Sequence, residues 1–170
     1  MANYYSPTVV QQVIAKRDMT ELEILILSQV FDADLEGETV YLCTSESPCD
    51  TIWVAADRLR AALDYPRAKD STALAELLGQ HGEALQGDDE IEIDTSGGWW
   101  ETLLQDIVRR SDTLDHITVM TSFTCDKMRP DGCGGIATLI TKDKIRSQST
   151  EELMAHFIAE AVEAGEMQPI

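Results

Sequence analysis

The segment Thr20–Phe31, TELEILILSQVF, constrains the fold more than any other part of this sequence. Thr20 and Glu23 have the spacing of a capping box, in which each side chain accepts a hydrogen bond from the other residue's backbone N–H. Leu and Ile side chains then point in nearly every direction around the predicted helix. A helix that is apolar on all sides has to be buried on all sides. The sequence therefore predicts a central helix around which the other elements pack.

The other hydrophobic patterns predict a mixture of strands and helices. Each half of the chain has the order strand, helix, strand, strand, helix, which predicts an α+β fold: an antiparallel or mixed β-sheet with helices packed on one face. The order also suggests a pseudo-repeat of a β-α-β-β-α unit. Strands are expected over Thr8–Ile14, Thr39–Thr44, Asp50–Val54, Glu90–Asp94, His116–Thr124 and Gly135–Thr141, and further helices over Ala55–Leu63, Ser71–Gly79, Trp99–Arg110 and Thr150–Ala164.

The last predicted helix has a second capping-box pattern, formed by Ser149 and Glu152. Its apolar residues Leu153, Phe157 and Ala161, together with His156, are expected to face the core. The chain of 170 residues suits one α+β domain spanning 1–170. An alternative division has two lobes, 1–79 and 88–170, joined by a glycine-rich loop over 79–88.

Charge is the strongest compositional signal. Asp and Glu number 31 against 13 Lys and Arg, which gives a formal net charge of −18. Such a chain repels nucleic acid and anionic lipid, so we expect neither direct nucleic-acid binding nor a membrane partner. We expect a partner protein with a basic surface. Because the N-terminal residues lack a signal-peptide pattern and no stretch of about 18 apolar residues occurs, a cytoplasmic location with reduced cysteines is expected.

The acidic residues are concentrated in blocks. No Lys or Arg occurs from Asp18 to Asp57 or from Asp70 to Asp106, whereas bases outnumber acids between Arg109 and Arg146. In the second block, acids alternate with Ile91 and Ile93, so the predicted strand has a carboxylate face. The predicted acidic binding surface consists of Asp88, Asp89, Glu90, Glu92 and Asp94. An edge strand kept soluble by its charge would have the same pattern.

The stretch Phe123–Gly135, FTCDKMRPDGCGG, is the most distinctive local motif. It is predicted to be the connection of a β-hairpin, with a positive φ at Gly132 and a basic tip formed by Lys127, Met128 and Arg129. The four cysteines lie at two predicted hairpins, this one and the one that joins Thr39–Thr44 to Asp50–Val54, so a zinc site is an alternative prediction. Its ligands would be Cys43, Cys49, Cys125 and Cys133.

Three alternative functions are compatible with these patterns. The leading prediction is a non-catalytic acidic protein-binding module that needs no cofactor. Its more specific form is an inhibitor or adaptor that imitates nucleic-acid charge. The second is a zinc- or thiol-dependent protein that uses the four cysteines. The third is a small enzyme whose site cannot be read from one sequence, although the absence of a catalytic motif argues against an enzyme.

Overall fold

The computed structural model describes residues 3–71, 75, 79, 82, 85, 87, 89–127, 129 and 132–168 of the chain. Its central element is helix α1 (Glu21–Val30), which begins at Thr20 with the predicted capping box. The Glu23 backbone N–H donates to Thr20 Oγ1 at 3.1 Å, and the Thr20 backbone N–H donates to Glu23 Oε2 at 2.8 Å. Six of its residues are buried, whereas Glu21 and Gln29 are exposed, so the helix is central as predicted but is not buried on all sides.

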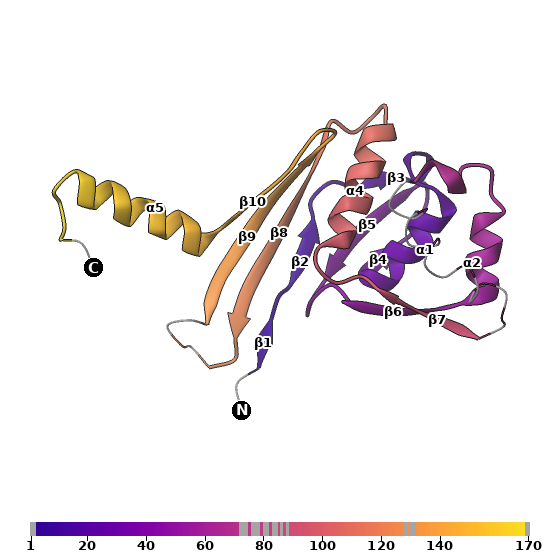
Figure 1. The fold of residues 1–170 in the computed structure, drawn as a ribbon, viewed down its shortest axis with the longest axis horizontal. Coiled ribbons are helices and arrows are strands. Elements are labelled where there is room, and N and C mark those ends of the chain that lie inside the picture. Colours follow the sequence, from indigo (N-terminus) through magenta and orange to yellow (C-terminus); the bar gives the residue numbers. More distant parts are fainter. Residues whose placement is uncertain are drawn as a thin grey trace.

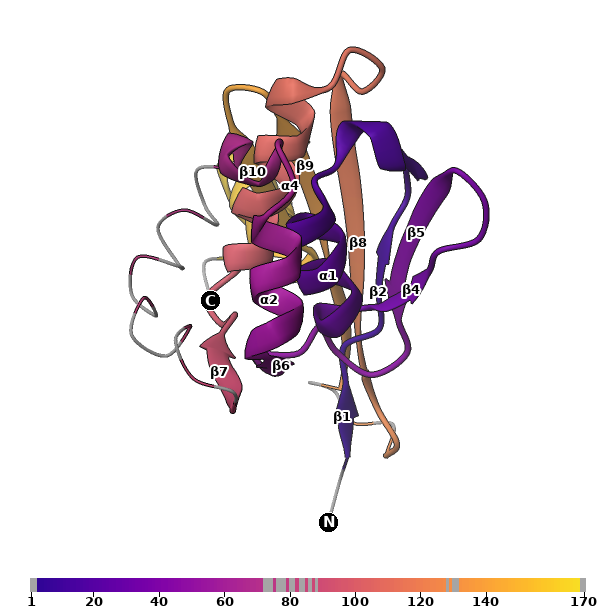
Figure 2. The same cartoon turned by 90° about the vertical axis from the view of Figure 1, so that its right-hand side faces the viewer.

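The main sheet is antiparallel at every pairing between its described strands. Its strand order is β10-β9-β8-β2-β5-β3, with β1 added to β8 and β4 added to β5. Helices α1, α2 and α4 lie on one face of this sheet (Figures 1 and 2). The strands are β1 (Tyr4–Tyr5), β2 (Thr8–Val10), β3 (Ile14–Ala15), β4 (Asp32–Asp34), β5 (Thr39–Thr44), β8 (His116–Cys125), β9 (Cys133–Thr141) and β10 (Ile145–Ser149).

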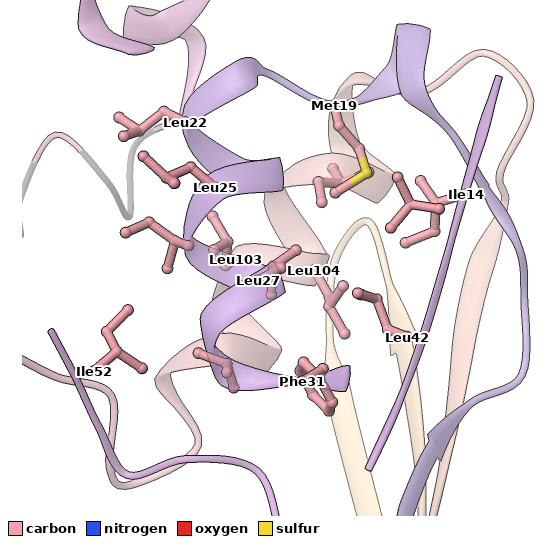
Figure 3. Close-up of a cluster of buried hydrophobic side chains, with 14 of the residues drawn as sticks. Ile14, Met19, Leu22, Leu25, Leu27, Phe31, Leu42, Ile52, Leu103 and Leu104 are labelled. Atoms are coloured by element: carbon pink, nitrogen blue, oxygen red, sulfur yellow. The ribbon is translucent and has the colours of Figure 1, made fainter. Parts of the chain in front are cut away.

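A second, two-stranded sheet joins β6 (Thr51–Ala55) to β7 (Glu90–Asp94). Figure 3 shows Ile14 and Leu42 of the main sheet on one side of α1 and Ile52 of β6 on the other. The core therefore surrounds α1 between the two sheets. The remaining elements of the body are α2 (Ala56–Leu63), α4 (Trp99–Arg110) and the 3₁₀ turns η1 (Lys16–Asp18) and η2 (Ala68–Asp70).

These elements confirm the predicted α+β class, but they do not confirm the pseudo-repeat. The two strands β5 and β6, expected as neighbours, lie in different sheets, because β6 pairs with β7 instead. Strands β4 and β10 were not predicted, since their sequences DAD and IRSQS lack an apolar alternation. Most of the helix expected over Ser71–Gly79 lies outside the described residues.

Each of the two sheets pairs a strand that precedes residues 79–88 with a strand that follows them. Strand β2 pairs with β8, and β6 pairs with β7.

Among the described residues, no helix has the length and apolar character needed to cross a membrane.

Helix α5 (Thr150–Glu163) departs from the expected packing. Its capping box is present, with Glu152 N–H donating to Ser149 Oγ at 3.0 Å and Ser149 N–H donating to Glu152 Oε2 at 2.8 Å. However, α5 contains no buried residue, and it extends away from the rest of the molecule (Figure 1). The prediction that Leu153, Phe157, Ala161 and His156 form a core face is therefore wrong: the helix leaves the sheet at the end of β10 instead of folding over it.

Candidate protein-binding face

The sequence alternation in β6 and β7 divides their small sheet into two faces. Ile52, Val54, Ile91 and Ile93 are buried and attach the sheet to the core. The residues between them point the other way because successive side chains in a strand alternate. We call this outward side the β6–β7 outer face; it is formed by Thr51, Trp53, Ala55, Glu90, Glu92 and Asp94.

The predicted carboxylate row lies on this face. Glu90, Glu92 and Asp94 are exposed, and neighbouring acids in the row are about 6.8 Å apart along the strand. Asp89 is also exposed and precedes the strand, where its carbonyl accepts a hydrogen bond from the Ala56 N–H at 3.2 Å. Asp88, the fifth predicted member, lies outside the described residues.

Trp53 lies on β6, opposite the middle of the acidic row on β7. It is directly opposite Glu92 in the strand register, and its neighbours Thr51 and Ala55 are opposite Asp94 and Glu90. Cross-strand partners have Cβ atoms about 4.5–5.5 Å apart, so the indole and the carboxylate share one surface. Trp53 is 54% exposed. This places a large aromatic side chain in solvent beside a row of negative charge.

Hydrogen bonds from Ser96 favour the charged form of Asp94. The Ser96 side chain and then the Ser96 backbone N–H, which donates to Asp94 Oδ1 at 2.9 Å, lower the pKa of this carboxyl below its ordinary value. A hydrogen bond to the charged form favours that form. Asp94 therefore remains ionised at lower pH than an ordinary aspartate.

No Lys or Arg among the described residues neutralises the acids of β7 or Asp89. Within the described residues, Asp89, Glu90, Glu92 and Asp94 form no ion pair with Lys or Arg. Elsewhere acids do have such partners, for example Glu23 with Arg110 and Asp106 with Arg109. These carboxylates are therefore open to interact with solvent ions or with a partner protein.

The predicted basic tip lies in the connection between β8 and β9, in the main sheet and not in the β6–β7 sheet. These strands form the expected antiparallel hairpin. Lys127 and Arg129 are exposed, and Arg129 donates a hydrogen bond to the Tyr4 hydroxyl at 3.3 Å. Met128 lies outside the described residues.

The glycines of this hairpin allow close approach and not an unusual φ. Gly132 does not have a positive φ, so that prediction is wrong. A Cβ on Gly134 would lie 3.1 Å from Thr150 Oγ1, and one on Gly135 would lie 2.9 Å from the Thr121 carbonyl oxygen. Glycine at 134 leaves room for Thr150, the first residue of α5, and glycine at 135 allows β9 to lie close to β8.

All four cysteines are free thiols at separate places in the main sheet or its loops. Cys125 is buried and Cys133 is exposed; because Cys133 is opposite Thr124, these two thiols point to opposite faces. Cys43 aligns through Val9 with Met120, five positions along β8 from Cys125, which is about 17 Å.

Within the described residues, no group of three or more His, Cys, Asp or Glu side chains is placed to hold a metal ion. Zinc binding by Cys43, Cys49, Cys125 and Cys133 stays a prediction that elemental analysis would test.

Sequence reasoning found the carboxylates but missed Trp53 as their neighbour. Its position in TIWVA, between Ile52 and Val54, already predicts an outward side chain, because the period of a strand is two. The pairing of this strand with Glu90–Asp94 has no local signal. It depends on the tertiary fold, which brings together segments about 40 positions apart.

Comparison with family models, curated proteins and solved structures finds no match to this chain. The proposals below therefore rest on the geometry and chemistry of the chain itself.

Proposed function

We propose that this protein is a non-catalytic binding module that uses the β6–β7 outer face to bind a partner protein with a basic surface. The observation that supports this proposal is the exposure of Trp53 on β6, opposite the middle of the row Glu90, Glu92 and Asp94 on β7. Tryptophan is strongly enriched among the residues that dominate binding energy at protein interfaces. Its position here matches the centre of a small interface with a charged rim.

The combination of groups suits the side chain of arginine or lysine. The indole face attracts a cation and also covers the apolar stem of such a side chain. The carboxylates then pair with the charged head, and with guanidinium they do so through two parallel hydrogen bonds. Because these acids have no Lys or Arg partner among the described residues, binding would not require an existing ion pair to break.

The more specific form of the proposal is imitation of nucleic-acid charge. Regularly spaced carboxylates on a rigid strand would present negative charge to the basic groove of a nucleic-acid-binding protein. The net charge of −18 would steer such a partner toward this chain at low salt. In this role the protein acts as an inhibitor or adaptor, without binding nucleic acid itself.

The test is affinity capture with the full chain from a lysate of its source organism, at low and at high salt. The captured protein is then purified, and its affinity is measured by fluorescence titration. Trp53→Ala is expected to weaken binding at least tenfold, which is about 1.4 kcal/mol or more. The triple variant Glu90→Gln/Glu92→Gln/Asp94→Asn is expected to remove most of the salt dependence.

Matched controls are available on other surfaces. Tyr65 is also 54% exposed, so Tyr65→Ala removes an equally exposed aromatic side chain away from β6–β7. Glu36→Gln/Glu38→Gln/Glu46→Gln makes the same change in net charge at exposed positions elsewhere. If the control variants weaken binding as much as the variants on the outer face, the proposed site is wrong.

Competition with duplex DNA separates the two forms of the proposal. Displacement of the chain from its partner by DNA supports imitation of nucleic-acid charge. Binding that depends on Trp53 but is unaffected by DNA supports only the general form, in which the partner is a basic protein of another kind.

A further inference from the structure

Helix α5 has an apolar side that the rest of the chain does not cover. At about 100° per residue, its larger apolar side chains share one half of the helix, with Glu151 near the margin of that half, and Glu152, His156, Glu160 and Glu163 lie on the other. Met154 is 57% exposed and Phe157 is 50% exposed. The apolar half consists of Leu153, Met154, Phe157, Ile158, Ala161 and Val162.

A helix of this length requires packing to be stable. It has 14 residues and none of them is buried. Isolated helices shorter than about 12–15 residues are marginal in water, and most helical stability in proteins comes from packing of an apolar side. The capping box at Ser149 contributes only part of what is needed. We therefore expect α5 to be covered in solution.

The chain's own sheet cannot cover it, because α5 begins at the residue directly after β10. Three contacts fix this junction: the two capping-box hydrogen bonds between Ser149 and Glu152, and the Gly135 N–H, which donates to Thr150 Oγ1 at 3.1 Å. No linker residues exist that would let the helix turn back. Because no described part of the chain covers α5, the cover is expected to come from another molecule.

The open side of the main sheet offers a matching surface. Opposite the side packed by α4, the register aligns Met120 with Ala137 and Gln148, and Thr118 with Leu139 and Arg146. Met120 is 45% exposed. These residues line a shallow hollow of about 460 Å³. Three strands of a sheet span about 10 Å, which is close to the diameter of one helix.

Charge complementarity favours a second copy of this chain as the occupant. Helix α5 carries acids and no Lys or Arg, whereas the hollow includes Arg146 and lies beside the turn that contains Lys142 and Lys144. Two α5 helices packed on each other would bring acidic sides near one another. The overall charge of −18 opposes association only weakly at physiological salt, because its field is screened beyond about 8 Å.

We propose that the protein forms a two-fold dimer in which α5 of each copy packs on the open side of β8–β10 of the other. This arrangement uses the same contact twice, as two-fold symmetry requires. It buries about twice the area of a single α5 contact, toward the ~1,200–2,000 Å² typical of stable interfaces. The inference concerns a different surface from the β6–β7 outer face and does not depend on the proposed function.

Sedimentation equilibrium of the full chain tests the proposal. We expect twice the chain mass of 18.8 kDa for the wild type and monomers for both Phe157→Glu on α5 and Met120→Glu on the sheet. The control Ala159→Glu adds the same charge on the polar half of α5 and should remain dimeric. Far-UV circular dichroism and thermal unfolding check that each variant still folds.

Mixing the two monomeric variants gives the decisive result. A mixed dimer has one contact in which an intact α5 meets an intact sheet, so Phe157→Glu and Met120→Glu together should restore association that neither shows alone. A wild-type chain that stays monomeric at about 100 µM, where even weak dimers form, overturns the proposal. So does a dimer that Phe157→Glu disrupts and Met120→Glu leaves intact, because α5 would then pair with α5.

Discussion

At the scale of single residues, the ion pair between Glu23 and Arg110 connects the central helix to α4. Glu23 has no exposed side-chain surface, and Arg110 Nη2 lies 2.5 Å and 2.7 Å from its two carboxylate oxygens. Glu23 also accepts the capping-box hydrogen bond from Thr20. Among the described residues, Arg110 Nε is buried without a hydrogen-bond partner. The pair is therefore needed mainly because each charge would be unfavourable without the other.

This arrangement predicts different outcomes for single and double substitutions. Arg110→Met should lower the free energy of unfolding by about 3 kcal/mol, because it leaves the buried Glu23 carboxylate without its partner. Glu23→Gln in the same chain should recover a large part of that loss, since glutamine keeps the capping box without the charge. Urea unfolding monitored by circular dichroism measures both. A double variant as unstable as Arg110→Met alone would show that packing of the guanidinium, and not its charge, stabilises the contact.

At the scale of elements, local patterns identify the type of an element more readily than its neighbours. The strands Thr39–Thr44 and Glu90–Asp94 and the helix Trp99–Arg110 were predicted with the bounds that the structure has. Their alternation and helical periodicity are local properties. The pairing of β6 with β7 is not local, so a hairpin of β5 and β6 was expected instead.

Helix α5 illustrates the same distinction for packing. Its sequence predicts its start at Ser149 correctly, because capping depends on neighbouring residues, but the predicted core face is not buried and His156 lies on the polar half. An apolar side has the same pattern whether its own core or another molecule covers it. The direction of α5 depends on the absence of residues between β10 and the helix, and β10 itself was not predicted.

Gly135 gives a prediction about the packing of β9 against β8. Gly135→Ala should lower stability by about 1–3 kcal/mol, because its Cβ would lie 2.9 Å from the backbone carbonyl oxygen of Thr121 and the strands would have to shift. Gly79→Ala is the control, since a Cβ there meets no atom within 4 Å and should be neutral or slightly stabilising. Thermal unfolding measures both variants. Equal melting temperatures for Gly135→Ala and the wild type would show that β8 and β9 are not as closely packed as the structure has them.

At the scale of the whole molecule, negative charge has opposite effects on binding and on stability. The net charge of −18 attracts a basic partner, and it also produces repulsion within the folded chain. On β7 the repelling groups are neighbours on one face of a strand, and none of them has an ion-pair partner among the described Lys and Arg residues. A surface whose charges serve binding is expected to lower the stability of the folded protein.

Neutralising this face should therefore raise the melting temperature. In low salt, Glu90→Gln/Glu92→Gln/Asp94→Asn is expected to melt a few degrees above the wild type, because like charges on one strand face no longer repel and an amide oxygen at position 94 can still accept the hydrogen bond from the Ser96 N–H. Added NaCl should raise the melting temperature of the wild type more than that of the triple variant, since salt screens the repulsion that the variant lacks. The matched variant Glu36→Gln/Glu38→Gln/Glu46→Gln shows how much of the gain comes from net charge alone. A triple variant that melts below the wild type would mean that these carboxylates stabilise the fold, and the β6–β7 outer face would then have a structural role in place of the binding role proposed for it.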